Sequence, residues 1–220
     1  MLHLYLVRHG ENPANVTKEF SCLKVDYSLT DKGRLQAEQT AVWFENHPLD
    51  VIISSPLRRT RETAQVVADH FNLPVEIMSD FIEVQVGDLE GTPATVAAWK
   101  FYTDIVQGWF SGNPEGRFPG GENFFEIRER LNRGLRLIAN RYDGKNVMIA
   151  GHAGIFSMIM PDWVADFDPQ IIVANEFQNC GITEIEIPNP LHSLQGKLIR
   201  WSSVEHLSGE AAKLVSPIMR

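Results

Sequence analysis

Several features that mark common protein classes are scarce in this chain of 220 residues. It has two cysteines, Cys22 and Cys180, too few for a disulfide framework and without the spacing of a metal site. We expect two reduced thiols, a single disulfide being the alternative. The N-terminus lacks the pattern of a signal peptide, and no apolar run approaches the roughly 18 residues that span a membrane. The sequence therefore predicts a cytoplasmic protein with no membrane partner.

Basic residues are also fewer than acidic residues, with 20 Lys and Arg against 28 Asp and Glu. The formal net charge is −8, which argues against a nucleic-acid partner held by a general basic field. If the ligand is an anion, its attraction must come from a few local arginines. There is no internal repeat, no low-complexity segment and no glycine-rich loop of the P-loop type.

The remaining composition is that of an ordinary globular protein, with 44% hydrophobic and 22% charged residues. We expect one domain over 1–220. Strand and helix patterns alternate along the first part of the chain, at 2–7, 28–47, 50–55, 59–71 and 74–78. This order predicts an α/β fold, a three-layer sandwich in which helices cover both faces of a mainly parallel sheet.

The second half continues the pattern after an interruption. Residues 92–126 are rich in aromatic, glycine and proline residues, and we interpret them as a lid-like insertion that is partly helical over 95–110. Apolar residues between 127 and 142 recur at helical spacing, and 146–152 is a further buried strand. Residues 182–187 and 196–204 are expected to pair as an antiparallel hairpin.

Chemically active side chains follow the predicted strands. Ligands of open α/β sheets bind beyond the carboxyl ends of the strands, so residues at these ends are candidates for a site. The candidates lie at the last positions of these strands or shortly after them. They are Arg8 and His9, then Ser54, Ser55, Arg58 and Arg59, then Glu83, and finally His152.

This set of side chains is suited to phosphoryl transfer. Arginines match phosphate oxygens in bidentate pairs, and a neutral imidazole can attack phosphorus. A second, protonated imidazole can stabilise the charge on the phosphoryl oxygens, while a carboxylic acid can protonate the departing oxygen. Phosphoryl transfer depends mainly on positioning and charge stabilisation, so no metal or other cofactor is expected.

The segment "LVRHGEN" resembles the signature of the histidine phosphatase superfamily, also called the phosphoglycerate mutase-like family. Further segments resemble that family in the same order along the chain: "SLTDKGRLQA", "SSPLRRTRETA", "FIEVQVGDLEG", "PGGEN" and "GHAG". Together they extend over roughly residues 2 to 160.

The resemblance implies roles for individual residues. His9 would be the nucleophile that becomes phosphohistidine, and Glu83 would be the proton donor. The substrate phosphate would be bound by Arg8, Asn15, Arg59, His152 and the backbone N–H of Ala153. In "PLRRT" the second arginine aligns with the family position. Arg58 is then interpreted as a solvated charge on a helix start, a contact with the substrate being the alternative. Glu11 and Glu90 are interpreted as structural hydrogen-bonding partners.

The chain departs from the family pattern at three positions. Asn12 replaces the usual threonine, Ala153 replaces the usual glycine after the second histidine, and Leu89 stands where an aromatic residue is common. None of these changes removes a catalytic group, but Ala153 and Leu89 are expected to alter the shape of the pocket.

The leading interpretation is a metal-independent phosphomonoesterase that acts on a small phosphorylated metabolite. A phosphoglycerate mutase is the second possibility. Mutases of this family carry an arginine pair and a proline run after the Glu-Gly segment, whereas residues 92–120 offer only Lys100 and Arg117. The sequence therefore favours hydrolysis over transfer between hydroxyl groups.

Two further functions fit the same residues less well. A phospholigand-binding module without catalysis would not need the intact set of histidines, arginines and carboxylate. A metal hydrolase would use His9, His152 and Glu83 as ligands. Two arginines aimed at the same point would repel a cation, which weighs against the metal hydrolase.

Overall fold

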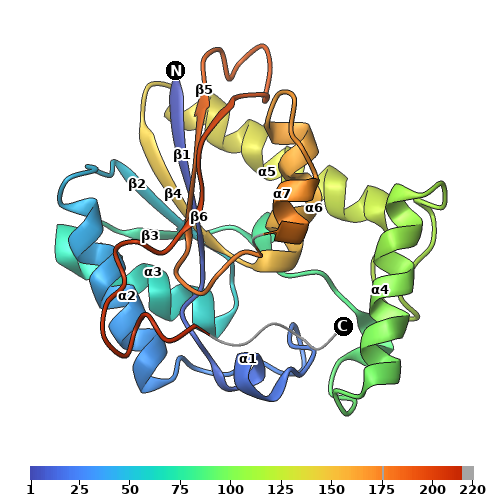
Figure 1. The fold of residues 1–220 in the computed structure, drawn as a ribbon. Coiled ribbons are helices and arrows are strands. Elements are labelled where there is room, and N and C mark those ends of the chain that lie inside the picture. The colour runs from blue at the N-terminus through green and yellow to red at the C-terminus, as the bar shows by residue number, and fades with distance from the viewer. Residues whose placement is uncertain (175, 215–220) are drawn as a thin grey trace.

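The structure, a computed structural model, describes residues 1–174 and 176–214 (Figure 1). A six-stranded sheet in the order β3-β2-β4-β1-β5-β6 forms its centre. The first four of these strands run parallel to one another, and β5 runs antiparallel to both β1 and β6. The strands are β1 (Leu2–Arg8), β2 (Val51–Ser54), β3 (Val75–Ile77), β4 (Asn146–Gly151), β5 (Ile182–Ile187) and β6 (Lys197–Ser203). The predicted α/β fold, mainly parallel sheet and C-terminal hairpin are confirmed.

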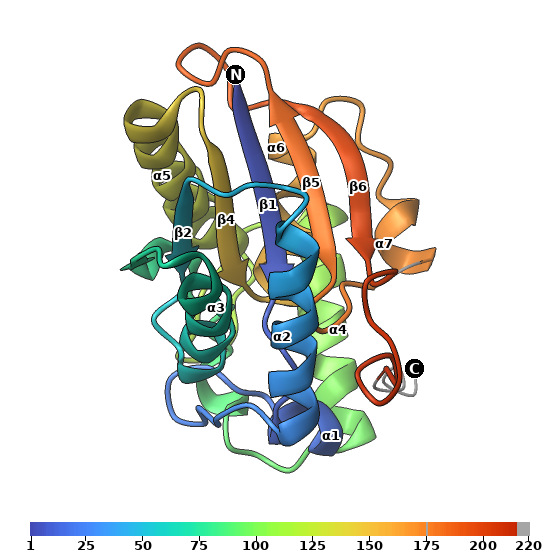
Figure 2. The ribbon, with the colours of Figure 1, turned by 90° about the vertical axis from the view of Figure 1, so that its left-hand side faces the viewer.

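Helices cover both faces of the sheet, as predicted. Helices α2 (Asp31–Phe44) and α3 (Arg58–Phe71) lie on one face, and α5 (Phe124–Tyr142) and α6 (Ala153–Trp163) lie on the other (Figure 2). Successive side chains of a strand point to opposite faces. Accordingly Leu4 and Leu6 join the core on the α5 and α6 side, while Tyr5 and Val7 join the core on the α2 and α3 side.

The segment that follows β1 packs tightly against the start of α2. The Thr30 side chain caps this helix by accepting a hydrogen bond from the N–H of Gly33 at 3.0 Å. A Cβ on Gly33 would lie 2.1 Å from the carbonyl oxygen of Glu11, and one on Gly10 would lie 2.5 Å from the carbonyl oxygen of Gly33. Glycine at both positions is therefore needed for the backbone after β1 to pass the helix.

Two helices lie beyond the carboxyl ends of the parallel strands, α1 (Pro13–Thr17) and α4 (Val96–Phe110) (Figures 1 and 2). Aromatic contacts join α4 to the core, with ring centroids 5.6 Å apart for Trp109 and Phe118 and 5.2 Å apart for Phe110 and Phe124. The helix expected over 95–110 is thus confirmed, whereas a lid function of 92–126 stays a prediction.

Some elements were not predicted: α1, α6, α7 (Gln170–Ala174) and the short 3-10 helices η1 (Ser79–Phe81) and η2 (Gly87–Leu89). Within the described parts of the chain, no helix is both long and apolar enough to cross a membrane. The sequence left open a role for the C-terminal segment 208–220, of which 215–220 lie outside the described residues.

Candidate active site

The register of the sheet brings the predicted strand ends together. Arg8 of β1 pairs with Gly151 of β4, and the next residue, His9, donates its N–H to the Gly151 carbonyl at 3.0 Å. On the other side of β4, the N–H of Ser55 donates to the carbonyl of Ala150, also at 3.0 Å. The residues after β1, β2 and β4 therefore lie side by side at one edge of the sheet.

A pocket of about 770 Å³ opens at this edge. Its inner end, next to the strands, is lined by six of the predicted site residues: Arg8, His9, Asn15, Arg59, Glu83 and Ala153. The seventh, His152, is fully buried behind the pocket surface, with its ring centroid 5.3 Å from that of His9. The structure thus brings the whole predicted set together, while the catalytic role of each residue stays a prediction.

His9 is held in one orientation and one tautomer. Its Nδ1 lies 2.8 Å from the carbonyl oxygen of Gly10, an atom that can only accept a hydrogen bond. Nδ1 therefore carries the proton and Nε2 carries the lone pair. Burial, reinforced by the charges of Arg59 and Arg8, holds the pKa of His9 well below its usual value. The ring is neutral at pH 7, which is the state that a nucleophilic imidazole needs.

Two buried guanidinium groups supply positive charge at the inner end. Arg8 donates from Nη1 to the carbonyl of Phe177 at 2.6 Å, and Arg59 donates to the hydroxyl and carbonyl oxygens of Ser21 at 3.1 and 3.0 Å. Burial lowers the pKa of Arg8 to about 10, which leaves it charged at neutral pH. These two arginines supply local positive charge in a chain whose net charge is −8.

The second histidine is oriented by a hydroxyl group from the neighbouring strand end. His152 Nε2 lies 2.8 Å from Ser55 Oγ, and its Nδ1 is buried without a protein hydrogen-bond partner among the described residues. Burial, and then the charge of Arg59, hold the pKa of His152 well below its usual value. A phosphate dianion nearby would favour the protonated, positively charged ring.

Glu83 sits at the N-terminus of α6. Its carboxylate accepts hydrogen bonds from the backbone N–H groups of Val84, Gly154 and Ile155, at 2.9, 3.3 and 3.1 Å. A Cβ on Gly154 would come within 2.6 Å of this carboxylate, so a glycine is required for the close approach. The helix N-terminus thereby holds a carboxyl group beside the two arginines.

A cluster of asparagines connects α1 to His9. Asn12 and Asn15 form a reciprocal cap at the start of α1, with the two backbone-to-side-chain bonds each at 3.1 Å. Asn179 donates to the carbonyl oxygen of His9 at 2.9 Å and to Asn15 Oδ1 at 3.0 Å. Because these contacts occupy the Asn15 oxygen, its amide NH₂ is the part available to a ligand. Sequence reasoning missed Asn179, which lies in an irregular segment before β5.

Three buried nitrogen atoms at this end lack a protein hydrogen-bond partner within the described residues: Arg8 Nε, Asn12 Nδ2 and His152 Nδ1. Buried polar groups in proteins are normally paired, and an unpaired one costs roughly 1–3 kcal/mol. Their grouping around a neutral His9 is typical of a site that an oxygen-rich anion completes.

The opposite side of the pocket, which we call the outer wall, has a different composition. It consists of three aromatic residues, Phe20, Trp99 and Tyr102, together with charged residues that are mostly acidic: Glu19, Lys100 and Asp104. For the aromatic group of this region, Trp99, Phe101, Tyr102, Trp109 and Phe110, the sequence favours core packing over ligand binding. Trp99 and Tyr102 line the pocket, Trp109 is buried in the core, and Phe101 and Phe110 are exposed.

The residues interpreted as structural have structural contacts. Glu90 accepts backbone N–H groups of Lys24 and Val25 at 2.8 and 3.0 Å, and Glu11 accepts the Thr30 hydroxyl at 2.9 Å. Arg58 is exposed, and its N–H donates to Asp26 at 2.8 Å. Neither Arg58 nor Leu89 is among the described residues that line the pocket.

The metal-hydrolase possibility is not supported by the arrangement of side chains. Among residues 1–174 and 176–214, no group of three or more His, Cys, Asp or Glu side chains could hold a metal ion. His9, His152 and Glu83 are therefore not arranged as a set of ligands.

One supporting residue, Arg130, gave no signal in the sequence because it falls in an amphipathic helix among many charged residues. It is 8% exposed and forms a bidentate ion pair with Glu122, with N···O distances of 2.7 and 2.9 Å. Its Nη1 also donates to the carbonyls of Asp80 and Ile82, both at 2.7 Å. Arg130 thus anchors the backbone that leads into Glu83.

Known proteins resemble this chain along almost its whole length. It is 27% identical over 209 residues to "Uncharacterized phosphatase PhoE" of Bacillus subtilis, covering 95% of this chain and 98% of that protein. It is also 27% identical over 222 residues to "Probable phosphoglycerate mutase GpmB" of Shigella boydii, covering 96% and 97%. Among solved structures, YhfR of Bacillus stearothermophilus superposes with a TM-score of 0.77 at 25% identity, covering 94% of this chain and 99% of that one.

The sequence pattern of a whole family agrees with this site. The pattern described as "Histidine phosphatase superfamily (branch 1)" matches residues 4–195, a span that contains the strand ends, the histidine pair and both buried arginines. The chain therefore belongs to branch 1 of the histidine phosphatase superfamily.

Proposed function

We propose that this protein is a phosphomonoester hydrolase that works through a phosphohistidine on His9, without a metal or other cofactor, on a small phosphorylated metabolite. The observation that carries the proposal is the state of His9. Its proton is held on Nδ1 by Gly10, and its ring is kept neutral by burial and two arginines. Residues of the same site carry buried nitrogens without a protein partner among the described residues.

The reaction follows from these groups in two steps. In the first, His9 Nε2 attacks phosphorus, the N–P bond forms, the P–O bond to the leaving group breaks, and the Glu83 carboxyl group gives its proton to the departing oxygen. Arg8, Arg59 and a protonated His152 stabilise the charge on the phosphoryl oxygens. In the second step water attacks phosphorus, the N–P bond breaks, Glu83 takes a proton from the water, and phosphate leaves.

A mutase is the second candidate, and the name of one relative favours it. The basic residues of the 92–120 segment weigh against it. Lys100 donates to both oxygens of Asp104 at 2.8 Å, and Arg117 pairs with Glu126 at 2.8 Å and is not among the described lining residues. Each of these two cations is therefore already paired with an acidic side chain and is not available to bind the carboxylate of a phosphoglycerate.

The test is hydrolysis of p-nitrophenyl phosphate between pH 5 and 8 with excess chelator, for the wild type, His9→Ala and the control His70→Ala. His70 is exposed on α3 and pairs with Glu45 at 2.8 Å. We expect chelator-resistant activity that falls at least about 10³-fold in His9→Ala and is unchanged in His70→Ala. Activity that survives in His9→Ala would overturn the mechanism. Phosphoryl transfer between phosphoglycerates without net hydrolysis would establish the mutase instead.

A further inference from the structure

We propose that the pocket selects phosphomonoesters whose leaving alcohol carries an aromatic or other bulky apolar group and no carboxylate. This inference rests on the proposed function and extends it to the class of substrate. Three observations on the outer wall carry it: the packing of its aromatic rings, the way these rings are held, and the sign of its charges.

The aromatic rings of the outer wall form one continuous surface. The ring centroids of Phe20 and Trp99 are 4.3 Å apart, those of Phe20 and Tyr102 are 5.6 Å apart, and those of Trp99 and Tyr102 are 5.3 Å apart. All three residues line the pocket. A surface of this kind gains most from a flat apolar group, through burial of area and through stacking.

These rings are held in place before any ligand arrives. Tyr102 stacks on the buried Phe118 with centroids 5.4 Å apart and planes inclined by 22°, and Trp99 donates its indole N–H to the carbonyl of Lys18 at 3.1 Å. Burial, and then the charge of Glu83, raise the pKa of Tyr102, so its ring stays uncharged. A preorganised wall loses little conformational freedom on binding. Other apolar residues extend the lining: Val86, Val96, Val106, Met158, Ile172 and Phe177.

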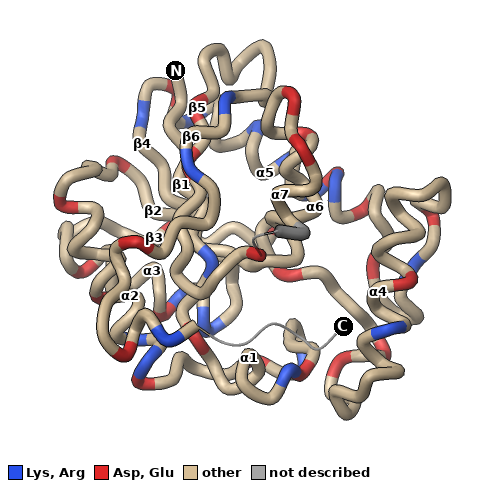
Figure 3. The backbone as a smooth tube through the Cα atoms, in the orientation of Figure 1, with Lys and Arg blue, Asp and Glu red and all other residues tan. Residues whose placement is uncertain are grey.

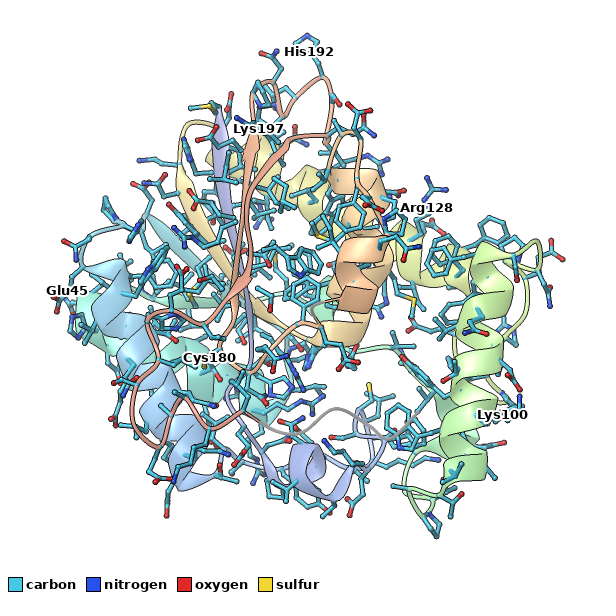
Figure 4. All side chains as sticks on the ribbon, viewed as in Figure 1. Glu45, Lys100, Arg128, Cys180, His192 and Lys197 are labelled. Carbon is cyan, nitrogen blue, oxygen red and sulfur yellow. The ribbon has the colours of Figure 1, made fainter. Side chains whose placement is uncertain are left out.

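The charges of the outer wall disfavour a second anionic group on the substrate. Lys100 lies on α4 (Figure 4). Its ammonium group donates to both oxygens of Asp104. Glu19 adds a further carboxylate, and α4 itself carries charges of both signs (Figure 3). Of the described lining residues, the remaining cations are Arg8 and Arg59 at the inner end, where the phosphate is expected. A carboxylate on the leaving group would face like charges.

Three primary alkyl phosphates distinguish the effect of the aromatic rings from the effect of the charges: 3-phenylpropyl phosphate, glycerol 3-phosphate and 3-phosphoglycerate. All three release a primary alcohol, so their leaving groups have similar reactivity. We expect kcat/KM of the wild type to be at least about tenfold higher for 3-phenylpropyl phosphate than for glycerol 3-phosphate. We expect 3-phosphoglycerate to be the poorest of the three. Equal values for the first two, or a preference for 3-phosphoglycerate, would overturn the inference.

Matched variants test whether the preference for 3-phenylpropyl phosphate arises from the outer wall. Trp99→Ala is expected to lower the ratio of kcat/KM for 3-phenylpropyl phosphate over glycerol 3-phosphate about fivefold. Phe101→Ala, on the same helix but 42% exposed and outside the described lining, should leave that ratio unchanged. Trp99→Leu, with thermal melting of all three variants, covers the case in which the alanine variant fails to fold. An equal loss for both substrates in a folded Trp99 variant would contradict the role of the wall.

A second pair of variants tests the charge. Glu19→Gln should raise kcat/KM for 3-phosphoglycerate relative to glycerol 3-phosphate by about threefold, because it removes one like charge. Glu129→Gln is the control, because Glu129 is exposed on α5 and is not among the described residues that line the pocket. It should leave the ratio of the two kcat/KM values unchanged. An unchanged ratio in Glu19→Gln would remove the electrostatic part of the inference.

Binding of phosphonates, which cannot be hydrolysed, keeps this inference distinguishable from the proposed function. Calorimetry with 3-phenylpropylphosphonate and 3-phosphonopropanoate should show tighter binding of the apolar compound by about tenfold. That preference without hydrolysis of any phosphate ester would refute the proposed function and support the inference. Hydrolysis of the esters together with equal affinity for both phosphonates would support the proposed function and refute the inference.

Discussion

The inner end and the outer wall of the pocket are built by different means. At the inner end, Arg8 ends a strand and His9 and His152 directly follow strands, so the backbone hydrogen bonds of the sheet place them. In the outer wall, Trp99 and Tyr102 come from α4, a helix joined to the core through contacts between aromatic side chains. The comparison suggests that the inner end provides the chemistry and that the outer wall, which can vary without disturbing the sheet, selects the leaving group.

The strongest test of this division compares two adjacent arginines. Arg59 is 2% exposed and lines the inner end, whereas Arg58 is exposed and outside the described lining. We expect Arg59→Ala to lower kcat/KM by about 10²- to 10³-fold, because it removes a charge from the phosphoryl oxygens. Arg58→Ala should stay within about twofold. The measurement is the hydrolysis of an aryl phosphate, and similar losses in both variants would mean that the wrong arginine is placed in the site.

A second test concerns the scaffold of the inner end. Arg130→Met leaves the buried carboxylate of Glu122 without its partner and releases the backbone before Glu83. We expect the free energy of unfolding to fall by about 3 kcal/mol, with a loss of kcat, because breaking a buried ion pair leaves an uncompensated charge. Arg117→Met removes an ion pair that is about half exposed and should cost under about 0.5 kcal/mol. Urea unfolding of both variants measures the difference, and equal costs would show that burial of the pair is unimportant.

A smaller effect is expected from the group that orients the second histidine. Ser55→Ala removes the hydroxyl group 2.8 Å from His152 Nε2 and should lower kcat/KM about tenfold, with a shift in the acid limb of the pH profile. Ser55→Thr keeps the hydroxyl group and should restore most of the activity. A loss in Ser55→Ala without any change in the pH profile would indicate packing instead of orientation.

The smallest expected effect is the pH dependence of stability. The pKa values of His9 and His152 are lowered in the folded protein, mainly by burial, and burial also lowers the pKa of His206 to about 4. Below a pH of about 6.5 the unfolded chain binds protons that the folded chain does not, so stability falls with falling pH, by at most about 1.4 kcal/mol per unit for each such histidine. Above this pH these groups are neutral in both states and contribute nothing.

Urea unfolding at pH 7.5, 6.0 and 5.0 checks this sign. His152→Asn should show a shallower fall in the free energy of unfolding than the wild type, because one linked histidine is gone. Added inorganic phosphate should stabilise the wild type more at pH 6.0 than at pH 7.5, since a bound anion favours protonated His152. A wild type whose stability rises on acidification would contradict the lowered pKa values.

Much of the inner end was predictable because its signals are local. Strands buried on both faces appear as short apolar runs, and the ends of parallel strands meet at one edge of a sheet. Arg8, His9, Arg59 and His152 could thus be named from their positions after such runs. Asn179 and Phe177, which hold Asn15 and Arg8, lie in an irregular segment without periodic pattern, so no local signal marked them.

By itself the sequence determined the α/β order of elements, the strand ends that carry the site and the helix expected over 95–110, since all three depend on residues close together in the chain. Only the tertiary structure decided that Arg130 is buried against Glu122, that Glu83 meets the start of α6, and that Trp99 and Tyr102 face the pocket while Phe101 faces outward. These contacts join residues far apart in the chain, and they depend on how α4, α5 and α6 pack at the edge of the sheet, which no local pattern encodes.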